Sequence, residues 1–297
     1  MGNSNDSMRA ALIHAIEANS VEFFLAMGRA IGAEERQTPA IHWIIGSSPA
    51  DYHNCVVRAD LSPATVDAAI SASIERFQAH GVSGSWHVGP WMRPDDLGTR
   101  LAAHGFVHDS DDIGMAVWLD RLAKDSPGPA GLTIERVVDE AGLAAWTAVA
   151  APSFLGDGEP ETAWIKEVYR RLGLTGDVPW RHYVGSLDGE PVATATLFVG
   201  GGAAGVYFVA TLPAARRRGI GAALTLAALR DGRALGEQIG VLGASEAGYS
   251  VYRRLGFEAL CRIGIYEWRR SNPEGIRGEL RALDVRPDLD SGLGHDS

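Results

Sequence analysis

A turn rich in arginine and glycine is the part of this sequence best suited to chemistry. The motif Arg216-x-x-Gly219-x-Gly221 follows an apolar run at 206–212 and precedes apolar residues at helical spacing. Pro213 ends the predicted strand, because proline cannot donate to a ladder. The glycines let a bulky ligand approach the backbone, and the first amides of a helix carry the positive end of its dipole. The spacing predicts a cradle for phosphate oxygens.

A second motif follows the first at a specific spacing. Residues 239–245 predict another strand, and after a short helical stretch comes Tyr252-Arg-Arg-Leu-Gly256-Phe257. A strand, a phosphate turn, a helix, a strand and then Tyr-x-x-x-Gly-Phe resemble the acyl-CoA core of the GNAT N-acetyltransferase superfamily. The resemblance covers about residues 131–270.

The resemblance implies acetyl-CoA as the acyl donor, with no metal. The end of the first strand would meet the pantetheine arm and the thioester carbonyl, and the turn and helix start would hold the pyrophosphate. Some of the three arginines could instead form a solvated basic run. The expected CoA-binding residues are Val209, Ala210, Thr211, Arg216, Arg217, Arg218, Gly219, Ile220, Gly221 and Ala222.

The reaction implied by the resemblance is direct attack of a neutral amine on the thioester. A backbone N–H at the strand end would stabilise the oxyanion, and Tyr252 matches the general acid that reprotonates the CoA thiolate. Tyr252 could also be a core aromatic beside Phe257. Ser245 stands where the family often has asparagine and can still donate a hydrogen bond. The general base stays open between a water chain and several residues: Glu246, His182, Asp157, Glu159 and Glu161.

The acceptor is expected to bind near residues 150–164. Phe154 and Trp164 flank the acids Asp157, Glu159 and Glu161, and aromatic walls with carboxylates suit an organic cation. The alternative is an ordinary loop over a core aromatic. The short linker to the preceding domain would let that domain close one wall of the cleft.

The two halves of the sequence resemble each other. Ala59 and Gly105 are separated by the same 46 positions as Ala210 and Gly256, and similar residues surround both pairs. This constant offset of 151 positions indicates two copies of one fold, with chance similarity as the alternative. In the first copy the phosphate turn falls on residues 65–70, which lack glycine and arginine and include Asp67. The resemblance therefore implies a tandem GNAT protein with a degenerate N-terminal copy.

The expected fold class is α/β (α+β), with two GNAT-like domains. Each would hold a mixed, mostly antiparallel central sheet flanked by helices. The only proline- and glycine-rich break in mid-chain, residues 123–131, is interpreted as the linker. The expected units are 1–122 for the degenerate domain, 132–270 for the acetyl-CoA domain and 271–297 for a partly disordered tail.

Composition narrows the partners. The chain of 297 residues has a formal net charge of -10, which disfavours nucleic acid and favours a cationic acceptor. By this measure no stretch approaches the ~20 apolar residues that a membrane helix needs, and the N-terminus does not resemble a signal peptide, so a cytoplasmic protein is expected. Only two lysines accompany many arginines, which is typical of GC-rich bacterial genomes. A homodimer is left open.

The function predicted from these features is acetyl-CoA-dependent N-acetyl transfer to a primary amine of a small molecule. Two alternatives remain open at this stage. One is a non-catalytic acyl-CoA-binding regulatory module, and the other is a protein or peptide N-acetyltransferase. The sequence does not identify the acceptor or the acyl group.

Overall fold

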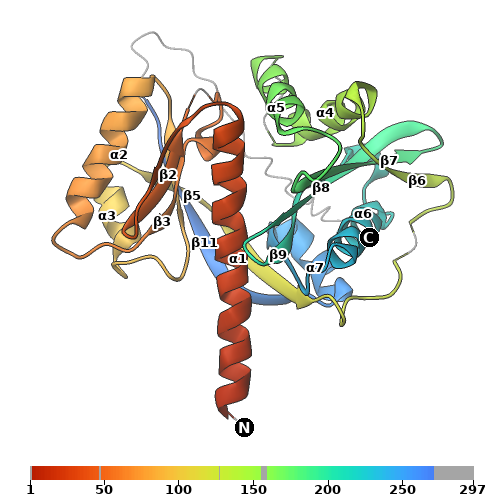
Figure 1. Cartoon of the computed structure of the whole chain (residues 1–297), viewed down its shortest axis with the longest axis horizontal. Coiled ribbons are helices and arrows are strands. Elements are labelled where there is room, and N and C mark those ends of the chain that lie inside the picture. The colour runs from red at the N-terminus through yellow and green to blue at the C-terminus, as the bar shows by residue number, and fades with distance from the viewer. Residues whose placement is uncertain (1, 47, 127, 155–158, 271–297) are drawn as a thin grey trace, which may run out of the picture.

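A single sheet of eleven strands runs through the computed structural model, which describes residues 2–46, 48–126, 128–154 and 159–270. The strand order is β1-β2-β3-β4-β11-β5-β10-β9-β8-β7-β6. Seven α-helices flank the sheet within the described residues, and α1 (Gly2–Ala30) stands in the middle of the molecule (Figure 1). The mixed, mostly antiparallel architecture agrees with the expected fold class, but the two expected sheets are merged into one.

The N-terminal half contributes five strands and two further helices. A short 3₁₀ turn, η1 (Asp51–His53), separates its second and third strands. The elements are β1 (Glu34–Gln37), β2 (Ile41–Ile45), β3 (Cys55–Ala59), α2 (Val66–His80), β4 (Gly84–Val88), α3 (Leu97–Ala103) and β5 (Val107–Trp118).

The C-terminal half contributes six strands and four helices. A 3₁₀ turn, η2 (Pro213–Ala215), follows its fourth strand. The elements are β6 (Leu132–Arg136), α4 (Glu140–Phe154), α5 (Glu159–Leu172), β7 (Trp180–Leu187), β8 (Glu190–Gly200), β9 (Ala203–Thr211), α6 (Ile220–Ala234), β10 (Ile239–Ala244), α7 (Glu246–Leu255) and β11 (Glu258–Trp268). The strands expected at 206–212 and 239–245 and the helix between them are present as β9, β10 and α6.

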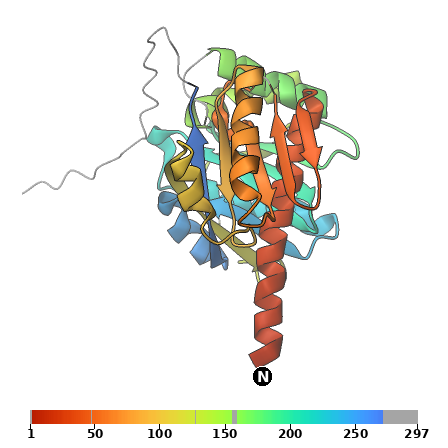
Figure 2. The ribbon, with the colours of Figure 1, turned by 90° about the vertical axis from the view of Figure 1, so that its left-hand side faces the viewer.

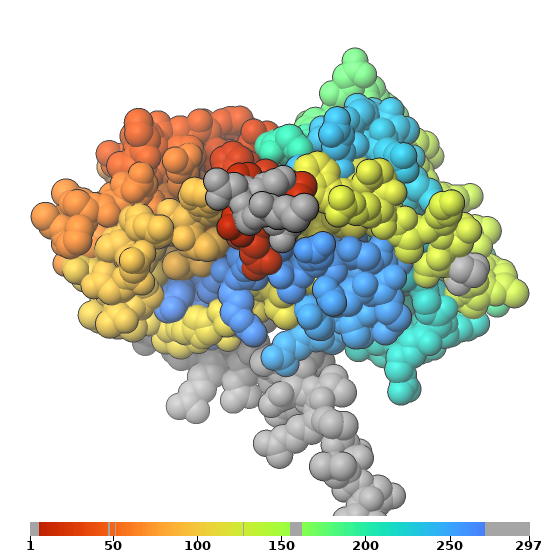
Figure 3. Space-filling view, turned by 90° about the horizontal axis from the view of Figure 1, so that it is seen from below, coloured from red at the N-terminus to blue at the C-terminus, as the bar shows by residue number. Residues whose placement is uncertain are grey.

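The last strands of the two halves are exchanged. Strand β5 pairs antiparallel with β10 of the C-terminal half, and β11 pairs antiparallel with β4 of the N-terminal half. The two exchanged strands also pair with each other over most of their length. Seen from below, the blue C-terminal residues lie against the yellow and orange N-terminal ones (Figure 3). Each half therefore completes its sheet with a strand from the other.

The sequence repeat is visible in the order of elements. Strands β5 and β11 begin at Val107 and Glu258, which are 151 positions apart, as the repeat predicted. In both halves a strand, a helix, a strand, a helix and a final strand follow one another in the same order. The described structure thus supports two copies of one fold, while residues 271–297 lie outside the described part.

The helices divide between the two faces of the sheet. Apolar side chains of α2 and α3 pack on one face of the N-terminal strands, and those of α6 and α7 pack on the same face of the C-terminal strands. Helices α1, α4 and α5 pack on the opposite face. Figure 2 shows α2 and α3 in front of the N-terminal strands. We call these the α6/α7 face and the α1 face.

Helix α1 joins the two halves through a buried amide. Asn19 is fully buried, and its side-chain N–H groups donate to the carbonyls of Gly200 (2.7 Å) and Ala203 (3.0 Å). Its carbonyl accepts the hydroxyl of Tyr207 at 2.7 Å. A Cβ on Gly201 would come within 2.5 Å of the α1 backbone at Ala18. The β8–β9 hairpin is therefore fastened closely to α1.

By length and composition alone, Asp6–Ala30 could cross a membrane, although no such stretch was expected from the sequence. In the structure this helix contacts β1, β2 and β3 on one side and β8, β9 and β10 on the other. Its residues Leu12, Ile16, Phe23, Phe24 and Met27 are buried in these contacts. The apolar composition is accounted for by its position as a core helix.

We expect Asn19→Leu to lower the free energy of unfolding by about 2–5 kcal/mol, because it leaves two buried carbonyls and a tyrosine hydroxyl without a partner. Urea denaturation followed by far-UV circular dichroism measures the change. Ser20→Ala, at the next position of α1, is the control. An unchanged unfolding midpoint for Asn19→Leu would show that α1 is held by apolar packing alone.

Candidate functional site

Two parallel strands of the C-terminal half separate to form a wedge-shaped gap, which we call the open splay. Strands β9 and β10 pair only at Ala204 with Gly240 and at Gly205 with Val241. Beyond these pairs, β9 bends at a bulge where Phe208 has φ +49°. The Thr194 hydroxyl donates to the Phe208 carbonyl at 2.9 Å and holds this bend. The end of β9 therefore offers its backbone to the gap rather than to β10.

The start of α6 lies beside the end of β9. Gly219, with φ +80°, precedes the helix, and the Ala223 N–H makes the first backbone bond to the Gly219 carbonyl (3.1 Å). The amides of residues 220–222 come before that bond and are free to meet an anion. A Cβ on Gly221 would lie 3.7 Å from both Val209 Cγ1 and Thr211 Oγ1. The helix start and the strand end thus form one continuous surface.

The three predicted arginines have different surroundings. Arg216 donates from Nε to the Thr211 carbonyl at 2.9 Å and so holds the strand end. Arg217 and Arg218 are exposed, and neither forms an ion pair with another described residue. Two unpaired guanidinium groups beside free helix amides suit a diphosphate. The predicted residues 209–222 lie together where the end of β9 meets the start of α6.

Tyr252 lies on α7, on the same face as α6. It is buried, it packs with Phe257 at a ring-centroid distance of 6.0 Å, and burial raises the pKa of its phenol to about 12. A phenol with that pKa stays protonated at neutral pH. Ser245 caps α7, because its Oγ accepts the Gly248 N–H at 3.3 Å. This contact is structural, and the catalytic roles of both residues stay predictions.

The candidates for a general base are dispersed. His182 is buried, its Nδ1 lies 2.8 Å from Thr196 Oγ1, and burial, with the nearby charge of Arg136, lowers its pKa to about 3. Glu246 is exposed in the first turn of α7. Asp157 lies outside the described residues, and so do the side chains of Glu159 and Glu161, whose backbone begins α5.

The two predicted aromatic residues lie on the α1 face. Phe154 is 46% exposed, and its ring contacts Phe208 at 5.3 Å between centroids. Trp164 stacks on His53 of the N-terminal half at 5.0 Å. The N-terminal half thus reaches the aromatic region beside the bulge.

Sequence analysis missed two polar residues beside the open splay. Asp112 on β5 and Tyr52 in η1 are joined by a side-chain hydrogen bond, and both come from the N-terminal half. No local motif marks either residue. They reach this position because β5 is paired with β10.

The corresponding gap in the N-terminal half is closed. Strands β3 and β4 also pair over two positions, but the Arg93 N–H then donates to the Ala59 carbonyl (3.0 Å) and the Leu61 N–H to the Arg93 carbonyl (3.2 Å). At the positions 151 residues later, no equivalent bond joins Ala210 or Leu212 to Ala244 in the described C-terminal residues. At the start of α2, Asp67 pairs with Arg100 at 2.7 Å.

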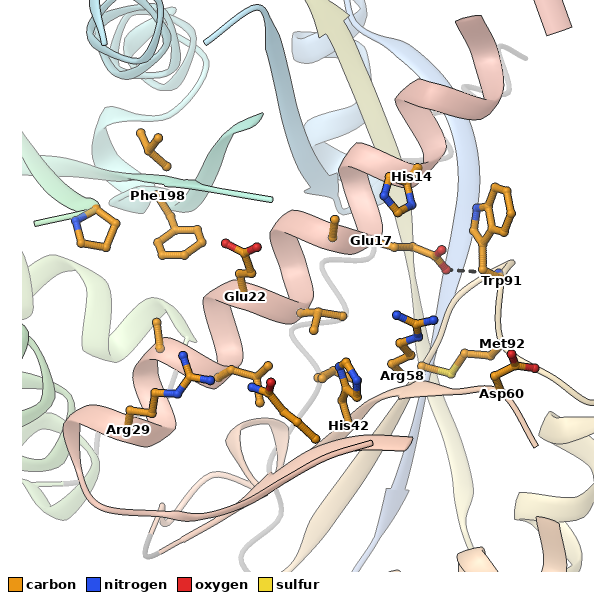
Figure 4. A pocket seen from close by; sticks show the side chains of 18 of the residues that line it. His14, Glu17, Glu22, Arg29, His42, Arg58, Asp60, Trp91, Met92 and Phe198 are labelled. Atoms are coloured by element: carbon orange, nitrogen blue, oxygen red, sulfur yellow. Dashed lines mark hydrogen bonds between the residues drawn. The ribbon is translucent and has the colours of Figure 1, made fainter. Parts of the chain in front are cut away.

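A separate cavity of about 1010 Å³ lies between α1 and the N-terminal strands (Figure 4). None of the predicted site residues line it. The Trp91 N–H donates to Glu17 Oε1 at 3.2 Å. Burial raises the pKa of Glu17 to about 7, although this hydrogen bond and the charges of Arg58 and Arg93 act against the rise.

Comparisons with known proteins agree with this geometry. A family model described as "Acetyltransferase (GNAT) family" matches residues 143–257. A GCN5-related N-acetyltransferase from Kribbella flavida has a similar structure, with a TM-score of 0.65 and 22% identity, covering 86% of this chain and 96% of that one. No curated protein matches the chain.

Two further solved structures share the fold. A functionally unknown conserved protein from Staphylococcus epidermidis has a TM-score of 0.62 at 13% identity, covering 81% of this chain and 96% of its own. A tandem GNAT protein from the clavulanic acid biosynthesis pathway has a TM-score of 0.54 at 16% identity, with 79% of each chain covered. At these identities the likeness concerns the fold alone. Residues 143–257 thus match the GNAT acetyltransferase family model, and the chain shares its fold with these solved structures.

Proposed function

We propose that the chain transfers an acetyl group from acetyl-CoA to a primary amine of a small molecule by direct attack. The observation that carries this proposal is the open splay with the start of α6 beside it. Free amides at residues 220–222 and the unpaired Arg217 and Arg218 fit the pyrophosphate. The gap between β9 and β10 fits a narrow pantetheine arm.

The donor side of the reaction belongs to the α6/α7 face. Bound acetyl-CoA supplies an activated carbonyl on a good leaving group. Backbone groups of residues 209–211 orient that carbonyl, and an N–H there polarises it. Tyr252 holds the proton that the departing sulfur needs, because its buried phenol stays neutral.

The acceptor side belongs to the α1 face. With CoA held at the start of α6, on the α6/α7 face, an amine would reach the thioester through the splay from the opposite side. Phe154 and the bulged Phe208 offer an aromatic surface there. Such a surface, in a chain of net charge -10, favours an organic amine over an anionic acceptor.

Incubation with acetyl-CoA and a panel of tyramine, spermidine, kanamycin and L-lysine tests this proposal. We expect thiol release with at least one amine, and mass spectrometry should find the acetylated product. Calorimetry with CoA should give one site per chain, since the N-terminal gap is closed. Binding without thiol release, also absent with a panel of peptides, would favour a regulatory module. Transfer to peptides alone would favour a peptide acetyltransferase.

We expect Gly221→Asp to abolish most of the thermal stabilisation by acetyl-CoA, because it places a carboxylate in the phosphate cradle. For the wild type, ligand at 100 times its dissociation constant stabilises the fold by about 2.7 kcal/mol. Gly221→Asn separates the effect of size from that of charge, and Gly221→Ala should fold normally since a Cβ there meets only ordinary contacts. A full thermal shift with the aspartate variant would remove this turn from the CoA site.

We expect Tyr252→Phe to lower kcat by about 10²-fold or more while leaving acetyl-CoA affinity nearly unchanged, since it keeps the ring and removes only the hydroxyl that carries the proton. Steady-state kinetics and thermal shift measure the two effects. Tyr249→Phe, on the exposed side of the same helix, is the matched control. If kcat is unchanged where chemistry limits the rate, Tyr252 has only a packing role.

A further inference from the structure

The exchanged strand β5 carries a carboxylate to the edge of the open splay. Ile113 pairs with Ala244 and Gly114 with Gly243, so Asp112 lies just beyond the end of β10. Its Oδ2 is 3.1 Å from the point that a Cβ on Gly243 would occupy. Glycine at position 243 therefore leaves room for this carboxylate.

The carboxylate of Asp112 is on the α1 face. Side chains alternate along a strand, and Gly114, two positions away, faces α1, because a Cβ there would lie 3.3 Å from Ile16. The neighbouring Asp111 points to the opposite face, where it pairs with His108 at 2.9 Å and with Arg262 at 3.4 Å. Two adjacent aspartates thus serve opposite sides of the sheet.

Three ionisable groups act on Asp112. Tyr52 from η1 donates a hydrogen bond to its carboxylate, Tyr207 lies toward it from β9, and Asp111 adjoins it in sequence. No described lysine, arginine or histidine forms an ion pair with Asp112. Burial, and to a lesser extent Asp111, raises its pKa, while the Tyr52 bond acts against the rise. A carboxylate with no cationic partner and a raised pKa is a stronger base than an exposed aspartate.

We propose that Asp112 is the general base of the C-terminal acetyltransferase site and that Tyr52 positions its carboxylate. This inference rests on the proposed function. The gap between β3 and β4 of the N-terminal half is closed, but this half would contribute a catalytic residue to the C-terminal site. The residue is on β5, the exchanged strand that pairs with β10.

The proton balance is complete with groups already named. Asp112 takes a proton from the acceptor ammonium, which leaves a neutral amine with a free electron pair. That pair forms the C–N bond to the acetyl carbon, and the C–S bond breaks with its electrons on sulfur. Tyr252 gives its proton to the sulfur, and the second proton lost by nitrogen restores the phenol. The proton on Asp112 passes to solvent at the end of the cycle.

The other described candidates fit this role less well. His182 makes a hydrogen bond through Nδ1 inside the aromatic core formed with Trp146 and Tyr169. Glu246 belongs to α7 and therefore to the face on which CoA is held. Asp112 faces the side from which the amine arrives.

Asp112→Asn tests the assignment, because it keeps the shape and the acceptor atom for Tyr52 while removing the base. The full chain is assayed with acetyl-CoA and whichever amine of the panel above releases thiol. At pH 7 we expect kcat/KM for the amine to fall by about 10²-fold or more. The deficit should shrink as pH rises toward about 10, because a larger fraction of the amine is then already neutral. Acetyl-CoA affinity should stay the same.

Asp111→Asn is the matched control, since it changes the neighbouring carboxylate on the other face. It should leave kcat/KM at pH 7 near the wild-type value and shift the pH profile only slightly to lower pH, because Asp111 makes a minor contribution to the raised pKa of Asp112. Tyr52→Phe should lower kcat/KM less than Asp112→Asn does. Its kcat/KM should still depend on pH as that of the wild type does. An Asp112→Asn enzyme with wild-type kcat/KM at pH 7 overturns the inference, and so does a deficit that is constant with pH. A wild type that acetylates no amine contradicts the proposed function itself, which is a distinct result.

Discussion

The antiparallel pairing of β5 with β11 is the interaction on which the rest of this structure depends. Each strand ends one copy of the repeat and lies beside strands of the other copy. Without the exchanged strands, β4 and β10 would leave backbone groups unpaired in the middle of the protein, and such groups need partners. One sheet therefore extends through both halves, and each half is complete only with the other present.

The two copies differ in whether a few backbone hydrogen bonds close the gap between their parallel strands. Both contain a parallel pair of strands that are hydrogen-bonded over only two positions. In the N-terminal half the segment after β4 returns to β3 through Arg93, and Met92 is buried beside it. In the C-terminal half α7 begins directly after β10, so no segment is left to cross the gap. Asp67 with Arg100 replaces the unpaired arginines of the other copy.

The sheet separates the chemistry into two sides. Helices α6 and α7 place the phosphate cradle and Tyr252 on one face, whereas α1, α4 and α5 bound the face from which an acceptor arrives. Asn19 fixes α1 to the β8–β9 hairpin and thereby sets the position of the bulge at Phe208. The N-terminal half adds His53 against Trp164 and Tyr52 beside Asp112 on this second face.

The cradle could be predicted from sequence because its parts are local. Pro213, Gly219 and Gly221 lie within nine positions, and the rules for ending a strand and beginning a helix act over that range. The repeat could also be predicted, since β5 and β11 preserve the offset of 151 positions. The strands and the helix around the cradle followed from periodicity for the same reason.

The tertiary structure alone decided that β5 pairs with β10 and β11 with β4. Strands β5 and β11 have the same place in the two copies and similar patterns, so nothing local distinguishes an exchanged from an unexchanged pairing. No local motif marks Asp112, and only its pairing beside β10 places it at the open splay. The hydrogen bonds that set this position join backbone segments far apart in the chain, and a local sequence pattern does not encode such a choice.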